Sequence, residues 1–345
     1  MRTFIHNNFH PLLSALSTRP LAWKYRWRLL LLWPTNILVN LIIKAPYFFR
    51  KKPYETIDIP TRSGRTRALL HRPPPSSPAP SPGSSSLRPL HVSLHPGGFI
   101  GGLPESQARL DQLISSRTGA IVVSPTYRFA PVHPYPAAID DIDDIIAWLH
   151  MHAADAFGAD PNLITTGGTS AGGNLGLAAC LGTYTCYAPI DLRIPPWQKK
   201  ILCREKYPKR DPFSFLQQLY NCYADLSGGR SGEARCSPMV MEAKDLPRDV
   251  LMVLAEIDVV VDESRRFVQR VSTELEDEGE SLVSDSRALV KGERRLEVME
   301  VEGAFHGWLE LPSSILEAER VRVFEKIVSF LGQVHRRYGY FGQST

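Results

Sequence analysis

The sequence is poor in cysteine, and its few cysteines follow no recognised spacing. All of them lie after the middle of the 345-residue chain, at Cys180, Cys186, Cys203, Cys222 and Cys236. An odd number without short paired spacings predicts neither a disulfide framework nor a zinc site. We therefore interpret these side chains as small buried hydrophobes, and one or two disulfides stay open if the chain enters the secretory pathway.

Cofactor motifs are missing as well. The chain has no dinucleotide-binding glycine fingerprint, and no Lys follows the glycines of residues 167–173, which excludes a Walker-type phosphate loop. An acidic group, Asp140, Asp141, Asp143 and Asp144, lies at the start of a predicted helix, where carboxylates favour the helix dipole and face water. We assign no metal to this group and expect no cofactor.

Acidic side chains are absent from residues 1–52, which carry nine Lys and Arg residues. These cations alternate with aromatic residues and aliphatic runs, a composition that suits a membrane interface better than nucleic acid. Residues 29–43 are interrupted by Pro34, Asn36 and Asn40 and are shorter than the roughly 20 residues of a spanning helix. We expect residues 1–52 to be a membrane-interface anchor or part of a lid, with a signal anchor as the alternative. The location is then either cytoplasmic or membrane-associated, and no nucleic-acid partner is expected.

The pattern of residues 53–345 predicts one α/β catalytic domain. It begins with a hairpin, residues 55–62 and 66–71, and continues through a Pro/Ser loop at residues 72–89. Apolar strands then alternate with helices, which predicts a mainly parallel central sheet with helices on both faces. The expected strands are residues 90–95, 120–124, 163–167, 184–188, 250–255 and 296–301, and the expected helices are residues 137–154 and those after Asp262 and Ile315. Residues 193–247 are irregular and indicate a cap-like insertion.

The stretch Gly168-Thr169-Ser170-Ala171-Gly172 follows an apolar strand and precedes a run of small residues. This G-x-S-x-G pattern is typical of a nucleophilic serine on a tight strand-to-helix turn, where flanking glycines remove the Cβ atoms that would obstruct the backbone. The pattern predicts Ser170 as the nucleophile, with Gly168 and Gly172 supporting the turn. The alternative is a phosphate-binding glycine loop.

A second glycine motif, His95-Pro96-Gly97-Gly98-Phe99, comes directly after the predicted strand at residues 90–95. Acyl transfer generates an oxyanion, and adjacent glycines let backbone N–H groups approach it. We assign Gly97, Gly98 and Ala171 to this oxyanion hole and interpret His95 as a structural member of the motif. The alternative is a plain glycine-rich turn.

From about Leu90 to its C-terminus the chain resembles the hormone-sensitive-lipase-like esterases of the α/β-hydrolase fold. Four motifs in the family's order carry the resemblance: HPGGF, YRFAPVHPYPAAIDD, GGTSAGGNL and AEIDVVVDES. The resemblance implies an acid at Asp258 and a histidine at His306, which agrees with the need of a serine for an imidazole base and of that imidazole for a carboxylate. Asp258 is favoured over Asp262 because it lies at the end of a strand.

Three features depart from the family pattern. Pro96 replaces the first glycine of the glycine triplet, and Val132 replaces a glutamate. Only residues 171–181 are available for the helix after Ser170, which is several turns shorter than the family's helix. This short helix is the main risk to activity.

These observations predict a serine hydrolase that cleaves lipophilic carboxylic esters through an acyl-enzyme on Ser170. An amide or lactone hydrolase, or an acyltransferase, with the same Ser170, Asp258 and His306 is an alternative. A non-catalytic small-molecule receptor on the same fold is another, against which retention of all three residues argues. The sequence makes no prediction of the oligomeric state.

Overall fold

The computed structural model describes residues 21–45, 51–78, 87–177, 182–200, 221–277, 294–311 and 314–340, together with Leu12, Leu16 and Tyr47. Parts of several predicted regions lie outside these residues. They are most of residues 1–20, residues 79–86 of the Pro/Ser loop, residues 178–181 after the elbow helix with Cys180, and residues 201–220 of the insertion with Cys203.

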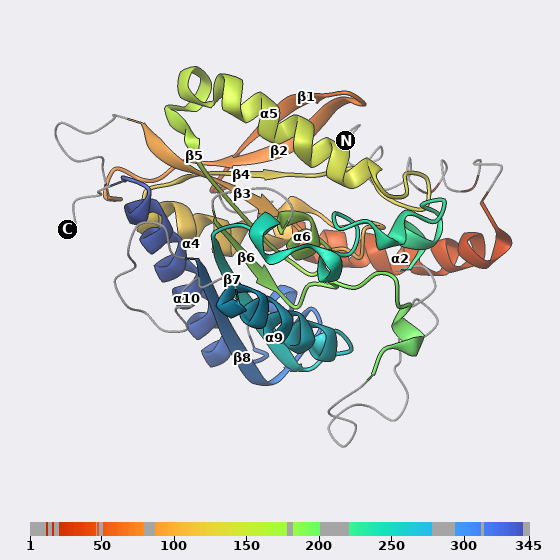
Figure 1. Ribbon diagram of the computed structural model, residues 1–345. Helices are drawn as coiled ribbons and strands as arrows, with labels where there is room; N and C mark the ends of the chain where they lie inside the picture. Colours follow the sequence, from red (N-terminus) through yellow and green to blue (C-terminus); the bar gives the residue numbers. More distant parts are fainter. Residues whose placement is uncertain are drawn as a thin grey trace.

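An eight-stranded sheet forms the centre of the described part of the chain (Figure 1). Its strands are β1 Glu55–Thr61, β2 Gly64–His71, β3 Arg88–Leu94, β4 Ile121–Pro125, β5 Ala159–Thr169, β6 Gly182–Cys186, β7 Asp249–Ile257 and β8 Arg295–Phe305. They run in the order β1-β2-β4-β3-β5-β6-β7-β8. β2 pairs antiparallel with its hairpin partner β1 and with β4, and all other neighbours are parallel. The predicted α/β class, the mainly parallel sheet and the edge position of the hairpin are confirmed.

Helices cover both faces of this sheet. They are α2 Trp23–Lys44, α4 Ala108–Thr118, α5 Ala137–Phe157, α6 Ala171–Gly176, α8 Cys222–Asp225, α9 Val261–Asp277 and α10 Glu317–Arg337, with short 3-10 turns η1 Pro104–Gln107, η2 Pro196–Gln198, η4 Arg230–Gly232, η5 Pro238–Val240, η6 Ala243–Asp245 and η7 Trp308–Glu310.

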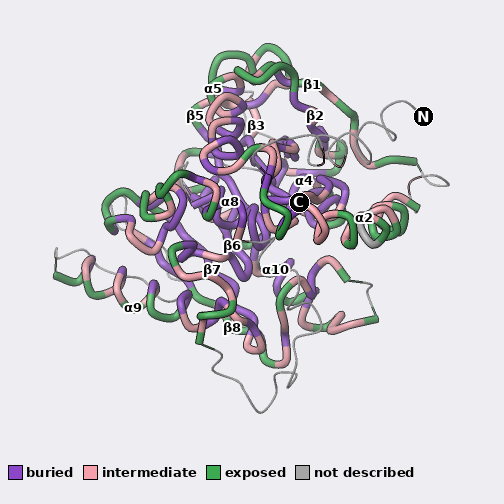
Figure 2. The backbone as a smooth tube through the Cα atoms, turned by 90° about the vertical axis from the view of Figure 1, so that its right-hand side faces the viewer, coloured by how far each residue is buried: buried purple, intermediate pink, exposed green. Residues whose placement is uncertain are grey.

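The side chains of the inner strands alternate between two packed layers, as β4 and β7 illustrate. On β4, Ile121 and Val123 pack with α5, whereas Val122 packs with α4 and α10. On β7, Met252 packs with α9 and Leu251 packs with α10. Helices α4 and α10 therefore cover one face, and α5 and α9 cover the other. Buried residues accordingly gather in the strands and on the inner helix faces (Figure 2).

Strand and helix positions agree with the sequence-based expectations, with differences at the ends. The strand expected at residues 184–188 ends at Cys186, because Tyr187 has φ 39° and cannot continue an extended chain. The N-terminal helix α2 is continuous over 22 residues, with Pro34 inside it.

One expectation about the acidic group is wrong. Asp141 does not face water but is buried. Its carboxylate is satisfied there by hydrogen bonds from the backbone N–H of Arg128 at 2.9 Å and from Arg128 Nε at 2.9 and 3.0 Å. Asp143 and Asp144 form ion pairs with Arg235 and Arg62. The group therefore ties the start of α5 to neighbouring segments.

Candidate active site

Ser170 lies on a strained turn between β5 and α6. Its backbone has φ 51° and ψ −120°, a conformation that L-residues rarely adopt. The turn is held because the backbone N–H of Ser170 donates to the carbonyl oxygen of Cys186 at 2.8 Å. The geometry is that of a serine presented at the carboxyl end of a central strand.

Glycines let this turn lie against the neighbouring strand end. Leu94 pairs with Gly168 in the parallel register of β3 and β5. A Cβ at Gly172 would overlap the carbonyl oxygen of Leu94, and a Cβ at Gly168 would overlap the same oxygen. The turn and the end of β3 are therefore in direct backbone contact, and no larger side chain fits at either glycine.

The imidazole of His306 contacts both Ser170 and Asp258. Its Nε2 lies 2.9 Å from Ser170 Oγ, and its Nδ1 lies 2.9 Å from Asp258 Oδ2. The other carboxylate oxygen of Asp258 accepts the backbone N–H of Val260 at 3.1 Å. Asp262, the alternative acid, lies on α9 and pairs with Arg266 instead. The structure thus brings together the three residues selected from the sequence.

The charges around His306 favour its protonated form. Loss of water around the ring lowers the pKa of His306, but the charge of Asp258 and its hydrogen bond together outweigh this effect, and Glu310 adds to them, so the pKa is raised. An imidazole that is stabilised when protonated is suited to take the proton of a serine hydroxyl.

The second glycine motif forms a tight loop after β3. Gly97 has φ 142° and Gly98 has φ 60°, and the N–H of Ile100 donates to the carbonyl oxygen of Gly97 at 3.0 Å. None of the hydrogen bonds between described residues uses the amide N–H of Gly97, Gly98 or Ala171. These three amides, at adjoining backbone segments, are available to an external acceptor.

His95 has a supporting place in this loop. Its Nδ1 lies 2.7 Å from the carbonyl oxygen of Pro96, and its ring stacks on Tyr127 with centroids 4.5 Å apart. Tyr127 in turn donates its hydroxyl hydrogen to the carbonyl oxygen of His95 at 2.9 Å. The buried ring fixes the path of the backbone that leads to Gly97.

One acidic residue of the site escaped the sequence analysis. Glu310 lies in η7, four positions after His306, and its carboxylate is bound by Thr169 and Tyr187. The available signal was a single acidic residue in the otherwise apolar run Gly307-Trp308-Leu309-Glu310-Leu311, where a helical turn returns the side chain toward the histidine.

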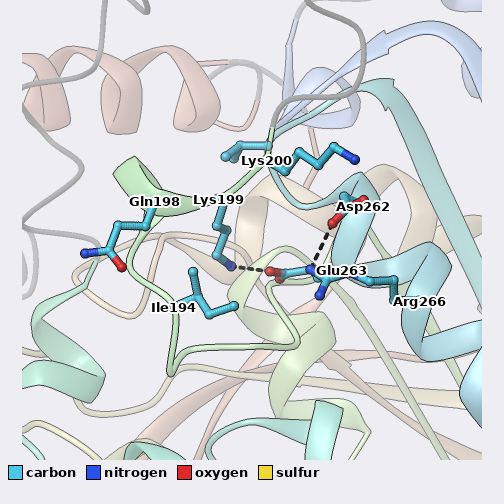
Figure 3. A pocket seen from close by; sticks show the side chains of 8 residues that line it. Ile194, Gln198, Lys199, Lys200, Asp262, Glu263 and Arg266 are labelled. Atoms are coloured by element: carbon cyan, nitrogen blue, oxygen red, sulfur yellow. Dashed lines mark ion pairs between the residues drawn. The ribbon is translucent and has the colours of Figure 1, made fainter.

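A pocket of about 320 Å³ opens beside the loop that carries Asp258, between residues 194–200 and the first turns of α9 (Figure 3). Its lining is Ile194, Gln198, Lys199, Lys200, Val259, Asp262, Glu263 and Arg266. Lys199 Nζ lies 2.6 Å from Glu263 Oε2, and Glu263 Oε1 accepts the backbone N–H of Ile190 at 3.0 Å. This wall therefore joins the chain after β6 to α9.

Within the described ranges, no three His, Cys, Asp or Glu side chains are arranged to hold a metal ion. The three cysteines in these ranges, Cys186, Cys222 and Cys236, are buried free thiols.

Curated relatives of this chain are hydrolases by name. It is 40% identical over 99 residues to the carboxylic ester hydrolase LipN of Mycobacterium tuberculosis, a match over 29% of this chain and 26% of that protein. It is 28% identical over 228 residues to an ethyl acetate hydrolase of Pseudomonas putida, over 62% of this chain and 68% of that protein. The chain thus spans about a quarter of the length of the first relative.

Solved structures agree in fold. An esterase of Pyrobaculum calidifontis superposes with a TM-score of 0.65 at 21% identity, over 87% of this chain and 92% of that one. Esterase LipW of Mycobacterium marinum superposes with a TM-score of 0.66 at 21% identity, over 87% and 89%. A family model described as alpha/beta hydrolase fold matches residues 91–285, more than half of the chain. The resemblance expected from the four motifs is therefore confirmed, and the chain belongs to the α/β-hydrolase fold family.

Proposed function

We propose that the protein is a serine hydrolase that cleaves carboxylic esters, with Ser170 as nucleophile, His306 as general base and acid, and Asp258 as the carboxylate that orients His306. The observation that carries this proposal is the continuous contact from Ser170 Oγ through both ring nitrogens of His306 to Asp258, with 2.9 Å at each step. The names of the relatives, carboxylic ester hydrolase and ethyl acetate hydrolase, support the ester as the bond that is cleaved.

The reaction follows from this geometry. His306 Nε2 takes the proton of Ser170 as Oγ attacks the ester carbonyl, and the amides of Gly97, Gly98 and Ala171 donate to the oxyanion. His306 then returns the proton to the leaving alcohol, which leaves an acyl-enzyme on Ser170. A water molecule, deprotonated by His306, attacks the acyl-enzyme; the bond between the acyl carbon and Ser170 Oγ breaks, Oγ takes the proton back from His306, and the carboxylic acid is released. Asp258 holds the ring and stabilises the imidazolium in both halves.

The alternatives receive less support. An amide or lactone hydrolase, or an acyltransferase, would use the same three residues, but the relatives reported above are named for esters. A non-catalytic receptor would have no use for a strained serine in contact with a histidine and a carboxylate.

The substrate we propose is a small, lipophilic ester, admitted under a cap built from residues 1–52 and 193–247. Contacts between these two segments support a joint cap. Lys24 Nζ lies 3.2 Å from Asp225 Oδ2, and the Tyr25 hydroxyl donates to the same oxygen. Tyr25 is buried, so α2 is fixed against α8 rather than free.

We further propose that the outer face of α2 lies on an anionic lipid surface. In the described part of the chain no helix meets the length and hydropathy of a membrane span. Seven large apolar side chains of α2 are exposed, and all of them except Val39 share one face at helical spacing: Trp23, Leu30, Leu31, Leu38, Leu41 and Ile42. Residues 1–52 carry Lys and Arg side chains but no Asp or Glu, a charge that favours contact with anionic lipid headgroups.

Vesicle sedimentation tests this contact. Leu31→Glu/Leu38→Glu should abolish sedimentation with vesicles of mixed anionic and neutral phospholipid, because both side chains are more than half exposed on that face, at 53% and 58%. Met151→Glu changes an exposed apolar residue on α5 and is the matched control, expected to sediment like the wild type. Sedimentation of the double variant at the wild-type level would overturn the contact.

Labelling with a fluorophosphonate probe tests the ester hydrolase. The wild type should react and Ser170→Ala should not, and hydrolysis of p-nitrophenyl esters of increasing acyl length should be lost in the same variant. Equal labelling of both proteins, or a folded wild type that neither reacts nor hydrolyses any ester of the series, would overturn the proposal.

A further inference from the structure

Glu310 carries a carboxyl group that lies beside Ser170 and His306 and has no role in the reaction proposed above. Its Oε1 accepts the Thr169 hydroxyl at 2.7 Å, and the Tyr187 hydroxyl donates to Oε1 at 3.1 Å and to Oε2 at 3.0 Å. Both donors are about 99% buried. A carboxylate that receives hydrogen bonds from two buried hydroxyls is held in one position.

The two donors are themselves parts of the site. Thr169 directly precedes Ser170 in the chain, so its side chain sets the end of β5 from which the turn begins. The ring of Tyr187 lies edge-on to the His306 ring, with centroids 5.3 Å apart and an interplanar angle of 61°. The backbone N–H of Tyr187 donates to the carbonyl oxygen of Val253 at 2.8 Å, which anchors it to β7. Glu310 thus joins the segment before the nucleophile to the residue that packs on the base.

The contacts on Thr169 continue into the interior and give the hydroxyl one orientation. Gln107 Nε2 donates to Thr169 Oγ1 at 3.4 Å, and Ser93 Oγ donates to Gln107 Oε1 at 3.2 Å. Because Thr169 accepts from Gln107, its own hydrogen is directed at Glu310. The three donors of this series of hydrogen bonds, Ser93, Gln107 and Thr169, are all buried.

We propose that Glu310 is a positioning residue of the hydrolase, whose carboxylate joins the Ser170 turn to the His306 loop and whose negative charge stabilises the imidazolium that forms during acyl transfer. This inference rests on the proposed function, and it adds a second carboxylate to the site.

The charges that act on His306 come from three directions. Asp258 and Glu310 both raise the pKa of His306, and Lys199, within the insertion at residues 193–247, lowers it. The pKa of Glu310 is raised, because burial outweighs its hydrogen bonds to Thr169 and Tyr187 and the charge of His306, all of which lower it. An ionised Glu310 and a protonated His306 therefore stabilise each other.

Glu310→Gln separates charge from shape. The amide keeps the size of the side chain and an acceptor oxygen for Thr169 but removes the charge. We expect kcat/KM for a p-nitrophenyl ester to fall about tenfold at neutral pH, mainly through kcat, and the acid limb of its pH profile to move to lower pH. Glu310→Asp keeps the charge and should hold the acid limb near its wild-type position.

A control variant on α10 and an NMR titration of His306 test the same role of Glu310. Glu317→Gln removes an acidic side chain of α10 that pairs with Arg109 of α4 and Arg320 of α10, and it should leave the profile unchanged. In the Ser170→Ala background, the pKa of His306 measured by NMR titration should be lower when Glu310 is Gln than when it is Glu. This titration reports on Glu310 even if no ester is hydrolysed, so the two proposals can fail separately. Superimposable pH profiles and an unchanged His306 pKa in folded Glu310→Gln would overturn the role of Glu310.

Discussion

Ser170 Oγ and His306 Nε2 lie 2.9 Å apart although 136 positions separate the two residues in the chain. Ser170 follows β5 and His306 follows β8, and β6 and β7 lie between them in the same parallel sheet. The carboxyl ends of parallel strands meet at one edge, so the sheet order brings these two side chains together. Asp258 follows β7, which lies between β5 and β8 in the sheet, so its side chain reaches the same edge.

Asp258→Asn should lower kcat for ester hydrolysis about 10³- to 10⁴-fold, because the amide no longer selects the tautomer in which Nε2 accepts the serine proton. Asp262→Asn is the control, since that side chain pairs with Arg266 on α9. Steady-state kinetics of both variants with one p-nitrophenyl ester make the comparison. A larger loss of kcat in Asp262→Asn than in Asp258→Asn would show that Asp258 is not the acid.

The pH profile of the wild type should have its acid limb above 6.5. His306 acts as a base only when it is neutral, and the charge of Asp258 together with its hydrogen bond outweighs the loss of water and raises the pKa of His306 above its ordinary value of 6.5. kcat/KM should therefore decline as the pH falls through that raised pKa. A profile that stays flat to well below pH 6 would contradict this assignment of the base.

Much of the fold could be predicted because its signals are local. The apolar strands β3 to β8 and the helix α5 have clear periodicity, and the strand-glycine-serine pattern at Ser170 is a short-range feature of the chain. The sheet order and the side on which each helix packs depend on pairing across the sheet, and the sequence alone carried no signal for them. The roles of Asp258, His306 and the oxyanion amides remain predictions.

The residues that were missed are those defined by burial. The place of Asp141 near a helix start led to the prediction of an exposed side chain, yet Arg128, in the segment between β4 and α5, packs on its carboxylate. Glu310 is recognised only when Thr169, at the end of β5, and Tyr187, directly after β6, meet its carboxylate. Such contacts are long-range, so periodicity and spacing do not reveal them.

Asp111→Asn should stabilise the protein at neutral and higher pH. Asp111 is fully buried, and its nearest basic group, His71 Nε2, lies 3.8 Å from it. Burial lowers the pKa of His71 to about 4, so this ring is neutral at pH 7, and burial raises the pKa of Asp111 from 3.8 to about 7. The folded state thus binds the proton of Asp111 more tightly than the unfolded state, and stability is lost as the pH rises from about 4 through about 7.

Urea denaturation at pH 5 and pH 8 measures this effect. The stability gain of Asp111→Asn over the wild type should be smaller at pH 5 than at pH 8, with about 1.4 kcal/mol for each unit by which the pKa is raised. Asp155→Asn, at an exposed position on α5, is the control and should change the stability little. A gain for Asp111→Asn that is equal at the two pH values would show that its carboxyl does not titrate differently in the folded state.

Lys199→Met should destabilise the fold much more than Lys200→Met, although the two residues are neighbours in the wall of the same pocket. The side chains of Lys199 and Glu263 are only 6% and 2% exposed, and loss of the lysine leaves a buried carboxylate without its cation, at a cost of about 3–5 kcal/mol. Lys200 is exposed and forms no ion pair with the described residues.

The loss of stability in Lys199→Met should depend on pH. Burial raises the pKa of Glu263, so protonation relieves the unpaired carboxyl at low pH and the loss should grow as the pH rises. Lys199→Met/Glu263→Gln, which removes both charges, should recover part of the stability in urea denaturation; equal losses in the two single variants would show that the pair does not stabilise this wall.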